Sequence, residues 1–262
     1  MSWIDLPFAD NLPLIPLVCL VMIFGSALQS AAGFGFGMAT IPLLMVLGAE
    51  SYEAIAILSI CGLGQTLYGG WSLREHVKWK RLTWMILLGS ATLPLGVWMQ
   101  HRLTVLEPET VRQIFGGVIL SAVILQTWCR IKPRDHVHPF WGVFAVVISG
   151  FIAGLAGMGG PPIVLWIMAH RWSNPESRVT MWLYFAGLTP CQLLFLQQRF
   201  GSDVSTSMAA GLILIPITLI GIIPGLWIGK RMSKTTLRRA GYIILTMIAL
   251  YAICQPWVFP SS

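Results

Sequence analysis

The sequence predicts an all-α polytopic membrane protein made of two inverted-topology repeats, each with about five hydrophobic segments. Composition is the first reason: hydrophobic residues make up 56% of the chain, charged residues only 10%, and the mean hydropathy is +0.74. An ordinary soluble domain carries roughly 25% charged residues. The second reason is a nearly unbroken series of apolar segments, and the third is a glycine-rich break in each half. We therefore expect one transmembrane domain over residues 1–262 and no separate soluble domain.

Ten apolar segments follow one another along the chain. They cover residues 12–32, 34–48, 52–73, 82–101, 111–129, 140–157, 160–171, 179–198, 207–229 and 237–257. A membrane-spanning helix needs about 20 apolar residues. Segments 34–48 and 160–171 are shorter and, at about 1.5 Å per residue, reach roughly 18 to 22 Å across a hydrocarbon core of about 30 Å. We expect these two to be half-helices or re-entrant segments.

The first segment loosely resembles a signal peptide near its end, at residues 26–32. It lacks a basic leader and carries Asp5 and Asp10 instead, so we expect a retained first helix. The five cysteines lie singly in apolar segments and lack the close pairing of zinc or redox sites. We expect them to be packing residues, with no metal and no cofactor.

The two halves share a pattern of small residues. Residues 32–36, with the sequence AGFGF, align with residues 156–160, with the sequence AGMGG. Further along, Gly62-Leu63 aligns with Gly187-Leu188, and Gly96, Trp98 and Arg102 align with Gly225, Trp227 and Arg231. This order predicts a first repeat at 12–129 and a second at 140–257.

The basic residues predict the orientation in the membrane, since cytoplasmic loops are rich in Lys and Arg. With both termini outside and each short segment returning the chain to its side of entry, all but three of the 17 basic residues lie inside. The three outside are Arg102, Arg112 and Arg199. Each half then crosses the membrane an odd number of times, so the second half is inverted. This loop pattern also accounts for the net charge of +7 without a nucleic-acid partner.

Inverted repeats are a recurring architecture of secondary transporters, whose sites lie where helices are broken. Here the breaks precede the two short segments, and Pro161-Pro162 follows the second. A helix N-terminus can bind an anion through its free N–H groups and dipole. We therefore expect the two helix starts to face each other around a small anionic substrate. The alternative is that these glycines only allow close helix packing.

Polar side chains near the breaks complete the candidate site, because a buried amide or hydroxyl requires a hydrogen bond. The candidate substrate-binding residues are Gln29, Ser30, Gly33, Gly35, Gly37, Gln65, Thr66, Gly157, Gly159, Gly160, Thr189 and Gln192. For the polar ones, a helix–helix hydrogen bond is an equally good interpretation. No Asp, Glu, Lys or Arg falls well inside a segment, so facilitated export or exchange is as plausible as proton coupling.

These features together resemble the TauE/SafE family of sulfite exporters. The resemblance rests on the paired glycine motifs, Pro94-Leu95-Gly96 with Pro224-Gly225, and the two-half layout, over about residues 15–255. It implies a bacterial inner-membrane protein with periplasmic termini that moves sulfite, organosulfonates or related organic anions. Carried over by position, the family's glycine motif falls on Gly33, Gly35 and Gly37, and on Gly157, Gly159 and Gly160.

Two other function classes remain to be weighed. A membrane-embedded hydrolase would need a nucleophile and a base, but Ser59 and Ser121 have no intramembrane His or carboxylate nearby in the sequence, so we expect no enzyme activity. A channel fits the hydrophobicity but gives no reason for the repeat. The substrate, the coupling ion and whether the protein forms a homo-oligomer are left open. As a test of binding, we expect Gly159→Leu to leave the protein folded and abolish transport.

Overall fold

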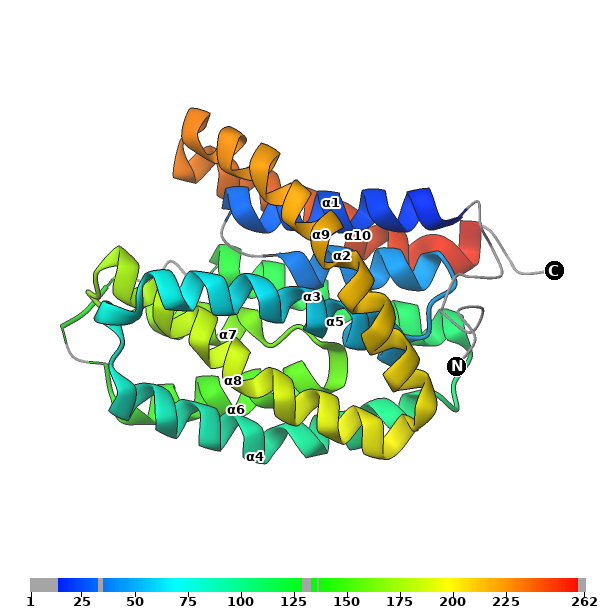
Figure 1. The fold of residues 1–262 in the computed structure, drawn as a ribbon, viewed down its shortest axis with the longest axis horizontal. Helices are drawn as coiled ribbons and strands as arrows, with labels where there is room; N and C mark the ends of the chain where they lie inside the picture. The colour runs from blue at the N-terminus through cyan, green and yellow to red at the C-terminus, as the bar shows by residue number, and fades with distance from the viewer. Residues whose placement is uncertain (1–13, 33–34, 129–132, 136, 259–262) are drawn as a thin grey trace. The chain divides into compact units, whose positions relative to one another are not determined.

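The computed structural model describes residues 14–32, 35–128, 133–135 and 137–258, which form ten α-helices and a short 3-10 turn at Arg74–His76 (Figure 1). The first-half helices are α1 (Ile15–Ala32), α2 (Phe36–Val46), α3 (Ser51–Ser72), α4 (Trp79–Leu103) and α5 (Pro108–Trp128). The second-half helices are α6 (Pro139–Ala156), α7 (Gly160–Met168), α8 (Asn174–Phe200), α9 (Ser202–Arg231) and α10 (Lys234–Val258). Each predicted segment corresponds to one helix, so the all-α fold class is confirmed.

The helices fall into long and short ones, as their apolar lengths predict. Among the described residues, six are long and apolar enough to cross a membrane: α3, α4, α5, α6, α8 and α9. Helices α1 and α10 contain shorter apolar stretches. Helices α2 and α7 have only 11 and 9 residues, which is about 14 to 17 Å at 1.5 Å per residue. The chain is a multi-pass membrane protein with two helices too short to span a bilayer.

The chain divides into two compact units that do not coincide with the predicted repeats. The first unit contains Met1–Cys61, Leu103–Val123 and Ser202–Ser262, and the second contains Gly62–Arg102 and Ile124–Gly201. Each unit therefore combines helices from both halves of the sequence. The chain passes between units inside α3, after Cys61, and inside α5, after Val123.

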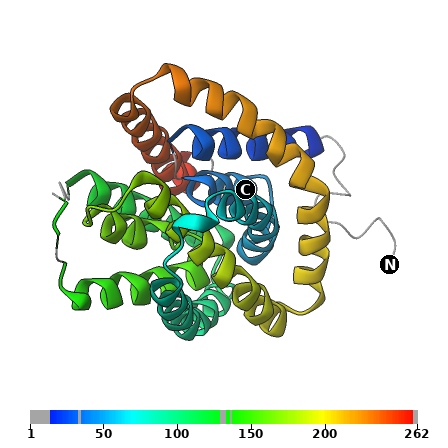
Figure 2. The same ribbon diagram turned by 60° about the vertical axis from the view of Figure 1, so that its left-hand side comes forward.

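The first unit is organised around a close contact between α1 and α9, which lie side by side in Figures 1 and 2. Small residues allow this approach: a Cβ added at Gly221 would overlap the carbonyl oxygen of Ile23, and one added at Gly225 would overlap that of Ala27. The Ser26 hydroxyl donates a 2.6 Å hydrogen bond to the Thr218 carbonyl oxygen, across the same contact. Helix α2 packs against α1 and α10, so α1 holds the short helix from one side.

The second unit contains an equally close contact between α4 and α6. A Cβ added at Gly96 would overlap the carbonyl oxygen of Phe151, and one added at Gly154 would overlap that of Leu93. A Cβ added at Gly150 would overlap the Gly89 carbonyl oxygen. Small residues at such positions let two membrane helices approach until their backbones touch.

The two contacts occupy matching places in the predicted repeats. Gly96 aligns with Gly225 in the sequence. Their contact partners, Phe151 and Ala27, are separated by 124 residues, as are the aligned glycines Gly33 and Gly157 of the two breaks. Each contact joins the fourth helix of one half to the first helix of the other. The matched contacts are consistent with an internal repeat, and both the repeat and the inverted orientation of its halves stay predictions.

Candidate functional site

The break in the second unit lies between α6 and α7. Helix α6 ends at Ala156 and is capped by Gly157, whose φ of +68° is the left-handed conformation that glycine adopts without strain. Its N–H donates a 2.9 Å bond to the Ala153 carbonyl oxygen and closes the last turn. Helix α7 then begins at Gly160 with two prolines in its first turn, where a fixed φ suits a helix start.

Two buried polar side chains hold this break in place. The Ser149 hydroxyl of α6 donates to the carbonyl oxygen of Gly159, and the Gln192 amide of α8 donates a 2.8 Å bond to that of Ala153. Both residues are buried, where an unsatisfied polar group would cost free energy. The structure thus brings the predicted residue Gln192 to the break, bonded to its backbone.

The adjacent residues Gly159 and Gly160 have different surroundings. A Cβ added at Gly159 would lie 2.5 Å from the Ser149 carbonyl oxygen and 2.9 Å from the Ala153 Cβ, so close packing alone accounts for glycine there. A Cβ added at Gly160 would have its nearest heavy atom, Phe185 Cζ, at 4.0 Å. In the direction of an added Cβ, open space therefore adjoins Gly160 and not Gly159.

The start of α7 has few hydrogen-bond donors. Pro161 and Pro162 lack an N–H, and no side chain caps the helix. The backbone amides of Gly159 and Gly160 are then the N–H groups that this end of α7 offers, together with the positive end of its dipole. An anion at this position would be bound by two amides at most.

Helix α3 contributes further small and polar residues to the second unit. A Cβ added at Gly62 or Gly64 would meet no atom within 4 Å, so this stretch also borders open space. Thr66 is buried and donates a 2.9 Å bond to the Gly62 carbonyl oxygen, while Gln65 is half-buried. Thr189 of α8 likewise donates to its own helix, at the Phe185 carbonyl oxygen. In this arrangement the two hydroxyls can accept a hydrogen bond from a ligand but do not donate one.

The break in the first unit precedes α2. Gly35 is the N-cap, with a φ of +104° and no side-chain cap, and Gly37 lies half-buried in the first turn. Gly33 lies outside the described residues. No proline occupies the first turn of this helix, so Phe36, Gly37 and Met38 all carry an N–H. This helix start offers more donors than the start of α7.

The remaining predicted residues of the first unit, Gln29 and Ser30, lie on α1. Ser30 faces α9, because a Cβ added at Gly225 would lie 2.7 Å from the Ser30 Cβ. Ser30 thus takes part in the close helix contact, and Gln29 is half-buried beside it. Whether the starts of α2 and α7 face each other stays a prediction.

Sequence reasoning missed a buried hydroxyl on α2. Thr40 is fully buried, its Oγ1 has no hydrogen-bond partner, and it lies against Gly25 of α1. In the sequence, the only indication of this buried hydroxyl is Gly25, whose missing side chain leaves room for Thr40.

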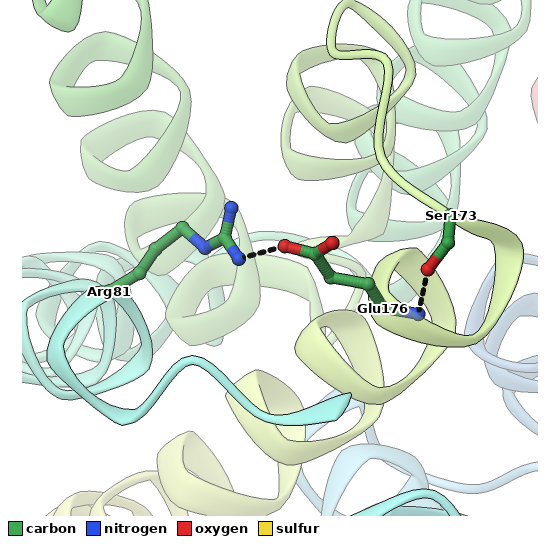
Figure 3. Close-up of polar contacts among 3 residues, drawn as sticks. All are labelled: Arg81, Ser173 and Glu176. Carbon is green, nitrogen blue, oxygen red and sulfur yellow. Dashed lines mark hydrogen bonds and ion pairs between the residues drawn. The ribbon is translucent and has the colours of Figure 1, made fainter. Parts of the chain in front are cut away.

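Sequence reasoning also missed the cluster that fixes the other end of α7. The Arg81 guanidinium donates to the Glu176 carboxylate, and Ser173 caps α8 by accepting a 3.3 Å bond from the Glu176 N–H (Figure 3). Arg81 also lies over the Trp172 ring, with its Cζ 3.6 Å from the ring centroid. Ser173 and Glu176 form the Ser-x-x-Glu pattern typical of a helix start, which could have predicted the N-terminus of α8.

An aromatic chain connects this cluster to α7. The ring of His170 lies 4.4 Å from that of Trp172 and 4.7 Å from that of Trp166, centroid to centroid. The Arg134 N–H donates a 2.9 Å bond to the Ala169 carbonyl oxygen. Through these contacts α4 and α8 position the C-terminal end of α7. Within the described part of the chain, no group of three His, Cys, Asp or Glu residues is placed to hold a metal ion.

These helices are those of a multi-pass membrane protein, and comparison with known proteins identifies the family. The sequence model of the sulfite exporter TauE/SafE family matches residues 18–252, so the chain belongs to this family. It is 23% identical over 239 residues to a probable sulfite/organosulfonate exporter TauE of Cupriavidus necator, covering 88% of this chain and 91% of that protein.

A second relative matches over a similar length. The chain is 24% identical over 264 residues to a probable membrane transporter protein of Methanocaldococcus jannaschii, covering 93% of this chain and 97% of that protein. No solved structure matches the chain. Family and relatives together support a membrane transporter.

Proposed function

We propose that this protein is a secondary transporter that exports small sulfur-containing anions, such as sulfite or organosulfonates, across the inner membrane by alternating access. The observation that carries the proposal is the match to the sulfite exporter family over residues 18–252. The name of the relative from Cupriavidus necator supports the same substrate class. Both termini would be periplasmic, as the distribution of basic residues predicts.

The glycine breaks supply the chemistry that such a substrate needs. Sulfite and sulfonates present oxyanions, which accept hydrogen bonds from backbone N–H groups and are favoured at the positive end of a helix dipole. The starts of α2 and α7 offer such groups without a side-chain cap. Gly160 adjoins open space for the substrate. A site without a fixed positive charge would bind an anion weakly enough to release it on the other side.

The two compact units are better candidates for the moving bodies than the two repeats. Each unit is fastened internally by backbone contact between helices of different halves, α1 with α9 and α4 with α6. Movement of one repeat against the other would break both contacts. Movement of one unit against the other would leave both contacts intact. Helix α3 would then bend near Gly62 and Gly64, where an added Cβ would meet no atom within 4 Å, so the helix is not tightly packed on that side.

Flux of labelled sulfite into proteoliposomes tests the proposal. Purified protein is reconstituted, and uptake is measured with and without a proton gradient, and then with unlabelled organosulfonates as competitors. We expect saturable uptake that sulfonates inhibit. If carboxylates inhibit and sulfur anions do not, the protein is a carrier of other organic anions. Uptake that rises linearly with concentration would indicate a channel.

A further inference from the structure

A cluster of exposed basic residues lies where α3 ends and α4 and α8 begin, all within the second unit. Arg81, near the start of α4, meets Glu176, in the first turn of α8 (Figure 3). Helix α8 also packs against the 3-10 turn Arg74–His76, which follows α3. The ends of three helices therefore lie together here. The exposed basic residues of this cluster are Arg74, Lys78, Lys80 and Arg178.

The basic cluster keeps a net positive charge. Its nearest acidic residue in the sequence is Glu75, and the Glu176 carboxylate is already paired with Arg81. In the part of the chain that the structure describes, no ion pair involves any of the four basic residues. Their charge is therefore available to an anionic partner from outside the protein.

Two guanidiniums of the basic cluster are held over tryptophan rings. The Cζ of Arg74 lies 4.6 Å from the centroid of the Trp71 ring, and that of Arg178 lies 4.9 Å from the centroid of the Trp182 ring. The two pairs belong to one packed surface, because a Cβ added at Gly69 of α3 would overlap the Trp182 ring. A guanidinium that stacks on a ring keeps the N–H groups at its edge for hydrogen bonds.

These N–H groups suit the oxygens of a phosphate. A guanidinium carries several donors in a fixed fork that matches phosphate geometry. Arg74 uses one donor on the Trp71 carbonyl oxygen, at 3.3 Å, and retains the others. Arg74 and Arg178 together offer more donors to one phosphate than either residue does alone.

Exposed apolar side chains border the basic cluster. Trp71 is 70% exposed, Trp79 at the start of α4 is 64% exposed, and Leu67, one turn before Trp71, is 51% exposed. Tryptophan is enriched where the hydrocarbon core of a membrane meets the lipid headgroups. The basic groups then lie at the depth of the lipid phosphates, beside rings that can contact acyl chains. A small soluble anion would leave these apolar side chains without a partner.

We propose that this surface is a binding site for an anionic phospholipid such as phosphatidylglycerol. Arg74 and Arg178 bind the phosphate oxygens, the two lysines of the cluster add positive charge, and the acyl chains lie along Trp71 and Leu67. Basic pockets between transmembrane helices bind anionic headgroups in this way. The lipid site is distinct from the proposed transport site, so its occupancy does not depend on which substrate is transported.

Native mass spectrometry of the full-length protein tests the lipid site. Delipidated protein in detergent is titrated with dioleoyl phosphatidylglycerol and, separately, with dioleoyl phosphatidylcholine. We expect the combined change Arg74→Gln and Arg178→Gln to weaken phosphatidylglycerol binding at least about tenfold and to leave phosphatidylcholine binding unchanged. The matched control combines Arg102→Gln and Arg199→Gln, which removes two exposed arginines from the last turns of α4 and α8 in the same unit. The control should bind phosphatidylglycerol like the unmodified protein.

Thermal unfolding in phosphatidylcholine checks that both double variants are folded. If the first is not, Arg74→Gln and Arg178→Gln are titrated separately, and each should weaken phosphatidylglycerol binding about threefold or more. Excess glycerol 3-phosphate, which has the phosphate but no acyl chains, should not displace the lipid.

Three results would overturn the lipid site. Unchanged phosphatidylglycerol binding without Arg74 and Arg178 would exclude their role. Equal weakening in the control would mean that only the overall charge of the protein attracts the lipid. Displacement by glycerol 3-phosphate would make the surface a site for a soluble anion.

Discussion

Neighbouring glycines in the same motif can serve different purposes. Gly159 is in contact with the α6 backbone, whereas Gly160 borders open space. The motif therefore combines a packing position with a position that can adjoin a ligand. The expectation that Gly159→Leu leaves the protein folded is wrong on this geometry, because even a Cβ there would lie 2.5 Å from the Ser149 carbonyl oxygen.

Substitution of Gly160 is accordingly the sharper test of substrate binding. We expect Gly160→Ala to unfold at the wild-type temperature and to raise the KM for sulfite several-fold, because the added methyl group occupies substrate space. Gly160→Leu should abolish flux. The matched control Gly159→Ala should instead lower the unfolding temperature, since overpacking costs about 1–3 kcal/mol. Normal flux in a folded Gly160→Leu protein would remove this glycine from the binding site.

The Arg81–Glu176 pair allows a second prediction at the level of residues. The two side chains are 19% and 20% exposed, and Arg81 also covers Trp172. Arg81→Lys keeps the charge but loses the planar contact, so we expect a loss of roughly 1–2 kcal/mol in unfolding free energy. A double-mutant cycle with Glu176→Gln, followed by thermal unfolding, measures the coupling. If the two changes lower the unfolding free energy additively, the interaction between Arg81 and Glu176 does not stabilise the protein.

Helices from different halves are fastened together by glycine in this protein. The contacts α1 with α9 and α4 with α6 bring backbones together, because a Cβ added at Gly96, Gly154 or Gly225 would overlap a carbonyl oxygen of the partner helix. In a membrane, where the hydrophobic effect does not drive helix association, such packing is a main source of stability.

Valine at either contact should therefore separate the helices. We predict that Gly96→Val and Gly225→Val each lower the yield of folded protein, with a cost of about 1–3 kcal/mol or more. Gly117→Val on α5 is the control, because a Cβ there meets no atom within 4 Å. Size-exclusion chromatography after graded heating compares the three. Equal behaviour of all three variants would mean that the two close contacts do not stabilise the protein.

For the whole molecule, hydropathy and glycine spacing predicted more of the fold than of the site. Ten segments and two short helices could be predicted because membrane helices need long apolar runs and breaks need glycine. The exchange of helices between halves could not, because an apolar run does not specify its neighbour. The sequence also could not separate Gly159 from Gly160, since the difference depends on Ser149 and α6. The Arg81–Glu176 pair joins residues 95 positions apart, which no local pattern relates.

The orientation in the membrane is a further prediction at this scale. We expect single cysteines introduced at Ser2 and Ser261, in a protein without its native cysteines, to react with an impermeant maleimide added to intact bacteria. A cysteine at Lys78, in the first predicted inner loop, should react only after the cells are opened. Labelling of Lys78→Cys in intact cells, with both termini protected, would reverse the orientation and place most basic loops outside.

Counterflow of sulfite is the most direct test of the transport proposal. Proteoliposomes are loaded with unlabelled sulfite and diluted into a trace of labelled sulfite, without any imposed gradient of protons or charge. A carrier with alternating access returns labelled substrate in exchange for the unlabelled, so we predict transient accumulation of label above its equilibrium level. Label that only equilibrates, at the same rate in loaded and empty vesicles, would contradict a sulfite carrier.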